Sequence, residues 1–428
     1  MTDILRQIIR DNRAGQIKAL PSVCSAHPDV LLASLLLAQE LDQPIIIEAT
    51  SNQVNQDGGY TGMRPADFVD FVTEIATGIG FDTKQIIFGG DHLGPQVWRA
   101  QPAETAMAKA EIMVAEYVRA GFTKIHLDCS EGCAGEPAQV DDETSASRAA
   151  RLAAVCEQAA VNPDALSYMV GTEVPPPGGA RIAEHEPVQT TNPAAATATL
   201  IKHFEAFDLA GISAAKNRIV ALVVQPGVEF SADHIDRLPA ESTMELRAAL
   251  AGFDGVCFEA HSTDYQHPQV YHDLAKIGFA IHKVGPALTF AFRKALYALD
   301  DILEKLDISH QPIATGMEKL MLENDGYWRS HYHGSEQNLR FLRHYSYADR
   351  IRYYWTNPAA IAAVERVLAA ANNADIPQPV WDQVFCARNK ERAERLERAG
   401  YPFAKAKVLA EIQLALVPYF FNNAQGLA

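Results

Sequence analysis

The sequence lacks any uninterrupted hydrophobic run of the ~18 residues that a membrane-spanning helix requires. Of its 428 residues, 48% are hydrophobic and 21% are charged, a composition typical of a globular protein with a large core. The opening residues, MTDILRQIIRDNRAGQ, have charges scattered through them and do not resemble a signal peptide. We therefore expect a cytoplasmic protein with no membrane partner.

Cysteine and positive charge are both scarce. Six cysteines spread over this length do not form a disulfide framework, and they fit a reducing cytosol. Cys129 and Cys133 are close in sequence, but no second cysteine pair supports a structural zinc site. The 37 Lys and Arg residues are outnumbered by 53 Asp and Glu, which gives a formal charge of -16. Because phosphate backbones are bound by clustered Lys and Arg, we expect no nucleic-acid partner.

Motifs that bind nucleotides are also missing. No G-x-G-x-x-G follows the first predicted strand, and no G-x-x-x-x-G-K-[ST] loop occurs anywhere in the sequence. We therefore expect no nucleotide cofactor, and the sequence gives no support to a kinase of the P-loop type.

Short strand-like runs alternate with longer helical patterns over the first three hundred residues. The predicted strands are 17–25, 44–50, 85–91, 124–130, 166–174, 218–227, 255–261 and 279–285. Between them, stretches such as 29–41, 66–79 and 104–121 have apolar residues at helical spacing. The strands are continuous apolar runs, typical of parallel strands covered on both faces. This pattern predicts an α/β fold, a (β/α)8 TIM barrel over residues 1–305, with an open doubly wound sheet as the alternative.

The strand pattern stops after about residue 305, and the remaining sequence predicts helices. No Gly/Ser-rich linker separates the two parts, so we expect residues 306–428 to form a helical extension packed on the barrel or on a partner subunit. A homo- or hetero-oligomer is expected. The aromatic side chains expected to anchor the extension are Trp328, Tyr332, Phe341, Tyr353, Tyr354 and Trp355.

Polar side chains lie at the ends of most predicted strands. In a TIM barrel the active site is built from the carboxyl ends of the strands and the loops that follow them. We therefore expect these side chains to converge on one cavity. They are Glu48, Asn52, Asp91, His92, His126, Asp128, Glu173, Gln225, Glu229, Glu259, His261 and Lys283.

Imidazoles and carboxylates among these residues predict a divalent-metal site, with zinc the expected ion. Three such ligands and an open position allow a metal to polarise a carbonyl group. His92, Glu173 and His261 supply this set from the third, fifth and seventh strands, and Gln225 lies beside them on the sixth. The alternative is that each histidine is a hydrogen-bonded structural residue.

Two further residues are assigned by their neighbours in the sequence. Asp91 is adjacent to a predicted ligand and is free to act as a general acid or base, although Asp before a loop is also a common turn former. His126 alternates with Asp128 in KIHLD, so both side chains point to the same side. His126 is therefore either a ligand or a residue that supports the ligands.

The loops after the strands offer further binding groups. Residues 50–63 are rich in amides and glycines, which suit either a polyol site or an ordinary surface loop. Residues 171–179, GTEVPPPGG, would frame or cover a site. Residues 261–266, HSTDYQ, add hydroxyl groups and an acid directly after His261.

Eight motifs together resemble the GatZ/KbaZ family. They are SVCSAHP, IEATSNQVNQDGGYTGM, GGDHLGP, KIHLD, GTEVPPPGG, VVQPGVEF, EAHSTDYQ and SYADRIRYYW. The family comprises the Z-type subunits associated with class II D-tagatose-1,6-bisphosphate aldolase, also labelled tagatose-6-phosphate kinase. The resemblance covers nearly the whole chain, including the C-terminal helices.

The resemblance implies residue roles, because the family is related to zinc-dependent class II aldolases. Asp91-His92 is similar to the aldolase Asp-His pair, in which Asp handles the proton of the substrate hydroxyl and His binds zinc. Asp128 resembles a second catalytic acid, Glu173 resembles the Glu after strand five, and His261 resembles a zinc ligand. The glycines before Asp91 would then make room for a sugar.

Two departures from the aldolase pattern bear on activity. Gln225 stands where those aldolases have a second zinc-binding His. Ser262-Thr263-Asp264 and the segment from Lys283 to Ala287 replace the motifs that hold substrate and phosphate. An acid near a phosphate is repulsive in a low-dielectric cleft, so the sequence does not favour cleavage of a bisphosphate by this chain alone. The residues expected to bind substrate are Glu48, Asn52, His126, Ser262, Asp264 and Lys283.

Two functions follow, both acting on a ketose or a ketose phosphate. The first is a subunit that supports a separate Y-type tagatose-bisphosphate aldolase. The alternative is a stand-alone, metal-dependent ketose 4-epimerase that links fructose and tagatose by retro-aldol cleavage between C3 and C4 and re-addition. A sugar kinase has no nucleotide-binding motif to support it.

Overall fold

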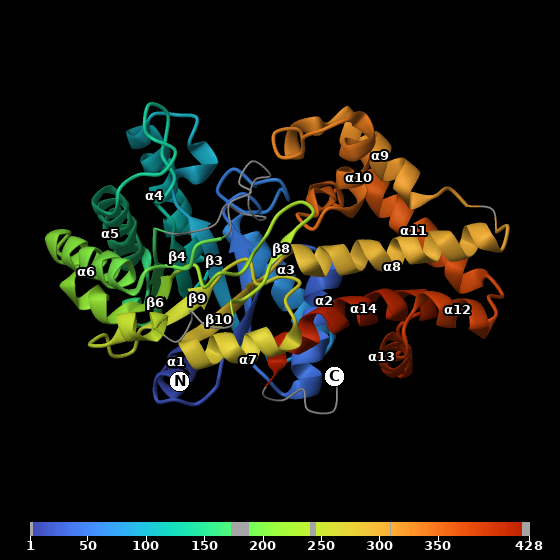
Figure 1. Ribbon diagram of the computed structural model, residues 1–428, viewed down its shortest axis with the longest axis horizontal. Coiled ribbons are helices and arrows are strands. Elements are labelled where there is room, and N and C mark those ends of the chain that lie inside the picture. Colours follow the sequence, from blue (N-terminus) through green and yellow to red (C-terminus); the bar gives the residue numbers. More distant parts are fainter. Residues whose placement is uncertain (1–2, 173–187, 240–244, 309, 422–428) are drawn as a thin grey trace.

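Eight parallel strands close into a barrel in a computed structural model that describes residues 3–172, 188–239, 245–308 and 310–421 (Figure 1). Around the barrel the strands follow the order β1-β10-β9-β6-β5-β4-β3-β2. They are β1 (Leu20–Cys24), β2 (Ile45–Thr50), β3 (Ile86–Leu93), β4 (Lys124–Leu127), β5 (Ser167–Val170), β6 (Ile219–Val223), β9 (Cys257–Ala260) and β10 (Phe279–Val284). Each coincides with a predicted strand, which confirms the TIM barrel and excludes the open sheet.

Helices cover the outside of the barrel, and one helix closes the end at which the strands begin. They are α1 (Ile4–Arg13), α2 (Pro28–Leu41), α3 (Pro65–Gly78), α4 (Ala103–Arg119), α5 (Asp142–Ala159), α6 (Pro193–Leu209), α7 (Pro268–Ile277) and α8 (Pro286–Lys305). Leu5 and Ile9 of α1 pack against barrel-lining residues such as Ile46 and Ile281. This apolar plug fills the amino-terminal end of the barrel, so polar interior residues gather toward the opposite end.

A small antiparallel pair lies in the connection between β6 and β9. It consists of β7 (Glu229–Phe230) and β8 (Ile235–Asp236). The sequence pattern did not predict it, because strands of two residues are too short to show a period. Glu229 and Phe230 are both buried, and Phe230 reaches the cavity at the mouth of the barrel.

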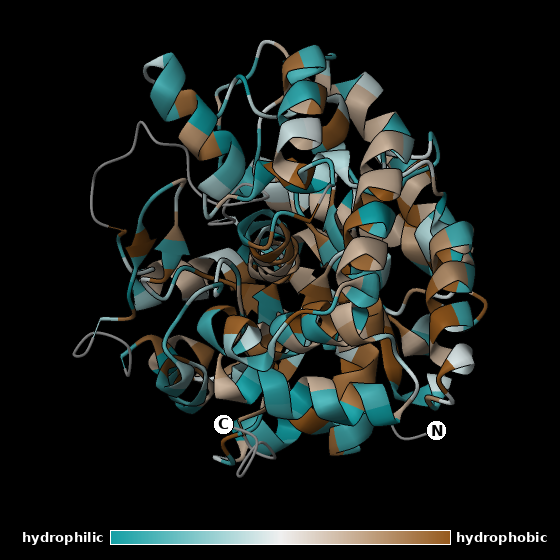
Figure 2. Cartoon of the chain, turned by 90° about the vertical axis from the view of Figure 1, so that its right-hand side faces the viewer, coloured by the Kyte–Doolittle hydropathy of each residue, from teal (hydrophilic) through white to brown (hydrophobic). Residues whose placement is uncertain are grey.

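The helices after α8 pack on one side of the barrel, at the right of Figure 1. They are α9 (Ile313–Glu323), α10 (Glu336–Tyr345), α11 (Pro358–Asn373), α12 (Gln378–Val384), α13 (Ala387–Arg398) and α14 (Phe403–Leu416). α14 contacts both α2 and α8. Nη2 of Arg392 lies 2.7 Å from Oε2 of Glu40, and the Tyr419 hydroxyl donates to the carbonyl of Thr263 over 3.1 Å. Figure 2 shows that these helices combine hydrophilic and hydrophobic residues.

The aromatic anchors of this extension are buried, with one exception. Trp328, Tyr332, Tyr353, Tyr354 and Trp355 are all buried. Phe341 differs from the expectation, because 51% of it is exposed on α10. The other five belong to the main apolar core, which joins the extension to the barrel.

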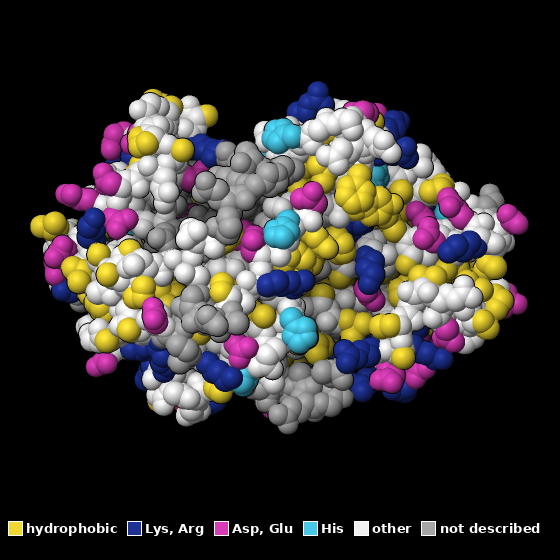
Figure 3. All heavy atoms as spheres, viewed as in Figure 1, with side chains coloured by type: hydrophobic (Ala, Val, Ile, Leu, Met, Phe, Trp, Pro, Cys, Tyr) yellow, Lys and Arg dark blue, Asp and Glu magenta, His cyan; other side chains and the backbone are white. Residues whose placement is uncertain are grey.

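The surface visible in Figure 3 mixes acidic and basic side chains rather than gathering one sign of charge. No helix within the described parts of the chain is long and apolar enough to cross a membrane.

Candidate active site

Asp91 and His92 lie together at the carboxyl end of β3, although adjacent strand residues ordinarily point to opposite faces. Pairing with β4 shifts register between Gly90 and Leu93, and His92 has a left-handed φ of 47°. A bulge of this kind bends a strand and turns a side chain to a new direction. It brings both Asp91 and His92 to the lining of one cavity.

The glycines around this pair allow neighbouring parts of the protein to pack closely against the backbone of β3. A Cβ on Gly89 would lie 2.8 Å from Cγ of Glu48, and a Cβ on Gly94 would lie 1.7 Å from the carbonyl oxygen of Asp128. Both distances are too short for a real contact, so a larger residue would displace Glu48 or the chain after β4. This corrects the expectation that the glycines leave space for a sugar.

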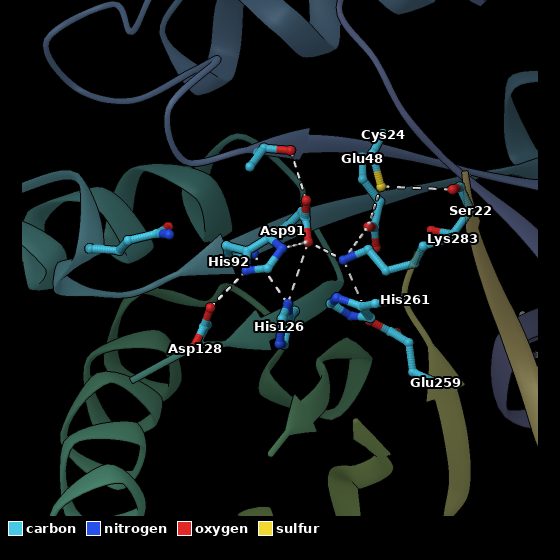
Figure 4. A network of polar contacts seen from close by, with 12 residues as sticks. Ser22, Cys24, Glu48, Asp91, His92, His126, Asp128, Glu259, His261 and Lys283 are labelled. Atoms are coloured by element: carbon cyan, nitrogen blue, oxygen red, sulfur yellow. Dashed lines mark hydrogen bonds and ion pairs between the residues drawn. The ribbon is translucent and has the colours of Figure 1, made fainter. Parts of the chain in front are cut away.

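Asp91 is buried and surrounded by donors (Figure 4). Its Oδ2 accepts a hydrogen bond from the Thr50 hydroxyl over 2.7 Å, and its Oδ1 forms an ion pair with Nζ of Lys283. Burial raises the pKa of Asp91, but His92 and Lys283 outweigh it and hold the pKa well below the ordinary value. The carboxylate is therefore ionised, the form that a general base requires, although the same partners lower its affinity for a proton.

Three imidazoles gather beside Asp91. The ring centroids of His92, His126 and His261 are 5.0–5.3 Å apart. Nδ1 of His92 lies 2.7 Å from Oδ2 of Asp128, and Nε2 of His261 lies 3.0 Å from Oε1 of Glu259. A carboxylate on one ring nitrogen fixes the tautomer and frees the other nitrogen, which is the usual arrangement of histidines that bind metals.

The protonation of the imidazoles differs between the three rings. Burial lowers the pKa of His126, and it lowers the pKa of His261 well below the ordinary value, so both favour the neutral form that can bind a metal. Burial also lowers the pKa of His92, but Asp91 and Asp128 outweigh it and raise the pKa above the ordinary value.

Two buried lysines lie among the carboxylates inside the barrel. Nζ of Lys124 lies 2.7 Å from Oε2 of Glu259 and also contacts Glu48. Nζ of Lys283 lies 3.0 Å from Oε2 of Glu48 and 3.5 Å from Oε1 of Glu259. Buried charges are stable when they are paired, so this network depends on both lysines.

The donors and the charge of the cluster fit a divalent cation. Ligand atoms of Asp91, His126 and His261 all lie within 4.8 Å of one another. The buried carboxylates are Glu48, Asp91, Asp128 and Glu259, and the buried ammonium groups are those of Lys124 and Lys283. Before His92 is counted, two negative charges remain, which a divalent ion would neutralise.

The other predicted site residues divide into three groups. Asn52, Ser262 and Asp264 line the same cavity as Asp91, His261 and Lys283, which has a volume of about 70 Å3. Gln225 is not among the residues that line this cavity, and its Oε1 accepts a hydrogen bond from the N–H of Gly227 over 2.8 Å. Glu173 lies outside the described residues.

Asp264 caps the helix that follows the last strand. Its Oδ1 accepts hydrogen bonds from the backbone N–H groups of Gly285 and Ala287, over 3.1 and 2.8 Å, at the start of α8. Burial raises the pKa of Asp264 to about 6, so its carboxylate is ionised at neutral pH. TIM barrels often bind phosphate near the loops after strands seven and eight, and here a carboxylate already takes the N–H groups of that helix.

Replacing Asp264 with Asn should change how stability depends on pH. The pKa of Asp264 is raised from 3.8 to about 6 in the folded state. Its contribution to the free energy of unfolding is therefore fully present at low pH and is lost as the pH rises through this range. Asn keeps the acceptor oxygen without the charge. We expect the variant to gain about 1 kcal/mol on the wild type between about pH 5 and about pH 7.5. Urea unfolding at both pH values measures this, and a difference independent of pH would contradict it.

Two residues near the cavity were not among the predicted site residues. Lys124 begins the KIHLD segment and alternates with His126 and Asp128, so a period of two placed it on their side of the strand. Arg352 lies in the 3-10 helix η7 (Arg350–Tyr354) of the extension and lines the cavity with Tyr353. No local sequence pattern connects Arg352 with a barrel residue so far away in the chain.

The barrel and its buried cluster of imidazoles, carboxylates and lysines define a TIM-barrel protein whose candidate active site lies at the carboxyl ends of the strands. The chain belongs to the D-tagatose-1,6-bisphosphate aldolase subunit GatZ/KbaZ-like family, whose model matches residues 5–423.

Individual relatives are similar over nearly the whole chain. The chain is 50% identical over 390 residues to a D-tagatose 6-phosphate 4-epimerase from Agrobacterium fabrum strain C58, covering 90% of this chain and 91% of that protein. It is 45% identical in sequence to the protein in a crystal structure of a probable tagatose 6 phosphate kinase from Sinorhizobium meliloti 1021. That similarity has a TM-score of 0.84 and covers 94% of this chain and 100% of the other.

Proposed function

We propose that this chain is a metal-dependent 4-epimerase that interconverts tagatose 6-phosphate and fructose 6-phosphate. The observation that carries the proposal is the Asp91 carboxylate beside His92 and His261 in one cavity, with the buried ring of His126 packed against both imidazoles. Of the two functions that the sequence leaves open, the 50% identical relative supports the stand-alone epimerase better than the aldolase subunit.

His126 and His261 would hold the metal, joined by His92 once its ring loses the proton that Asp91 and Asp128 favour, with zinc as the ion that the family resemblance implies. Asp91 also lies within reach of this ion, but we assign it to the proton, because Lys283 already compensates its charge and makes it a weaker ligand. When bound, a divalent ion polarises the ketose carbonyl and stabilises the negative charge that develops there.

The reaction needs one base at the C4 hydroxyl. Asp91 takes that proton, the C3–C4 bond breaks, and its electron pair moves to C3, where the C2 carbonyl delocalises it. C4 becomes an aldehyde, which rotates about the C4–C5 bond. The carbanion at C3 then attacks the opposite face of C4, and Asp91 returns its proton to the new C4 hydroxyl.

Activity of the chain without a partner subunit tests the function. Metal-loaded chain, purified without any Y-type subunit, is incubated with tagatose 6-phosphate, and separately with tagatose 1,6-bisphosphate. We expect fructose 6-phosphate from the first and no release of triose phosphates from the second, as followed by NMR. Turnover that appears only after a Y-type aldolase is added would instead identify a supporting subunit.

A further inference from the structure

We propose that Arg352, supplied by the C-terminal extension, binds the phosphate of the ketose and makes the site specific for phosphorylated sugars. The inference rests on the proposed epimerase function for the identity of the substrate. It assigns the barrel and the extension separate tasks, with proton and metal chemistry in the barrel and phosphate recognition at η7.

Arg352 is the cation at the cavity without a carboxylate partner among the described residues. Lys283 is paired with Glu48, Asp91 and Glu259. Arg352 instead donates to the carbonyl oxygens of Ala348 and Asp349 and, over 2.9 Å, to the hydroxyl of Tyr353. These bonds orient the guanidinium without cancelling its charge, which leaves it able to bind an anion.

The more usual position for a phosphate in a TIM barrel is already taken. The Asp264 carboxylate accepts the N–H groups of Gly285 and Ala287 at the start of α8. A phosphate there would lose those donors and face a negative charge. The phosphate must therefore be bound at another part of the cavity wall.

The shape of the cavity directs the phosphate toward Arg352. The space beside Asp91 is about 70 Å3, smaller than the ~300–1,000 Å3 of ordinary small-molecule sites. A second cavity of about 430 Å3 lies next to it. The residues that line both are Cys24, Gln53, Tyr60, Gly285 and Arg352. A ketose phosphate with its C3–C4 bond at Asp91 would not fit in the smaller space, so it would reach into the second cavity past the shared residues, of which Arg352 is the cation.

Neighbouring polar groups complete an anion site at the boundary. Tyr60 and Tyr353 are in edge contact, with ring centroids 4.9 Å apart, and Asn52 and Gln53 line the same wall. Phenol, amide and guanidinium groups all donate hydrogen bonds, which a phosphate dianion accepts.

Kinetics on paired substrates test the assignment. Arg352→Met should lower kcat/KM for tagatose 6-phosphate by at least about 30-fold, mostly through KM, because removing one member of a buried charge pair is costly. Turnover of unphosphorylated tagatose should change by less than about threefold, since no phosphate contact exists to lose. For tagatose 6-phosphate, the kcat/KM of Arg352→Lys should lie between that of the wild type and that of Arg352→Met. The control is Arg340→Met, which removes an exposed charge from α10 of the same extension.

Equal losses on both sugars, or no loss on either, would overturn the role of Arg352. Binding of inorganic phosphate provides a second readout that needs no turnover. Phosphate should raise the Tm of the wild type and of Arg340→Met at constant ionic strength, but not that of Arg352→Met. A phosphate effect that depends on Arg352 in a chain without epimerase activity would support the anion site and refute the proposed function. A phosphate effect that survives Arg352→Met would refute the site alone.

Discussion

Asp91→Asn is expected to lower the rate of ketose 6-phosphate epimerisation by about 10²–10⁴-fold, the usual contribution of a positioned acid or base. The amide cannot take the C4 hydroxyl proton, yet it keeps an oxygen for the hydrogen bond from Thr50. Lys283 keeps Glu48 and Glu259 as partners, so the fold should persist. Steady-state rates and circular dichroism measure the two effects.

Metal content separates the two roles that Asp91 could have. Elemental analysis should find the same metal content in Asp91→Asn as in the wild type, and a large loss in His261→Ala. The matched control Asp57→Asn, an exposed position in the loop after β2, should leave both rate and metal unchanged. Metal lost from Asp91→Asn would make Asp91 a ligand, and a rate above a tenth of the wild type would exclude it as the base.

Lys124→Met is expected to destabilise the protein by about 3–5 kcal/mol, because it leaves buried carboxylates without their counter-charge. Lys124 is completely buried and bridges Glu48 of β2 and Glu259 of β9 across the barrel interior. Methionine fills a similar volume, so the loss of stability reports on the charge. The denaturant midpoint and the Tm should both fall.

A second substitution should recover part of this loss. Adding Glu259→Gln to Lys124→Met removes one of the carboxylate charges that Lys124 had compensated, so the double variant should be more stable than Lys124→Met alone. Lys84→Met, at an exposed lysine before β3, should change the free energy of unfolding by less than about 0.5 kcal/mol. A loss below about 1 kcal/mol for Lys124→Met would show that the pairing is unimportant for stability.

The strands were predictable because a barrel of parallel strands requires continuous apolar segments, and each segment here ends in polar residues. The adjacent Asp91 and His92 were predicted as site residues because they stand at the end of one such apolar segment. Their common direction was not, because it depends on the bulge between Gly90 and Leu93 and on the left-handed φ of His92. Neither feature leaves a periodic signal in a single sequence.

The rest of the site depends on contacts that local patterns do not contain. Gln225 was expected near a metal because of its strand, but its side chain turns back to the N–H of Gly227. Arg352 reaches the cavity only because the extension packs along α8 and α2, and a helical pattern does not specify that packing. Asp264 was expected to bind substrate; it lines the cavity, and it also accepts hydrogen bonds from the start of α8, which its sequence does not show.

Epimerisation in D2O tests the central proposal most directly. Cleavage and re-formation of the C3–C4 bond break no carbon–hydrogen bond at C4, whereas a route through successive enolisations exchanges that hydrogen with solvent. Metal-loaded chain alone, incubated with tagatose 6-phosphate in D2O, should yield fructose 6-phosphate without deuterium at C4, as read by NMR. Deuterium at C4, or no fructose 6-phosphate from the chain alone, would contradict the proposal.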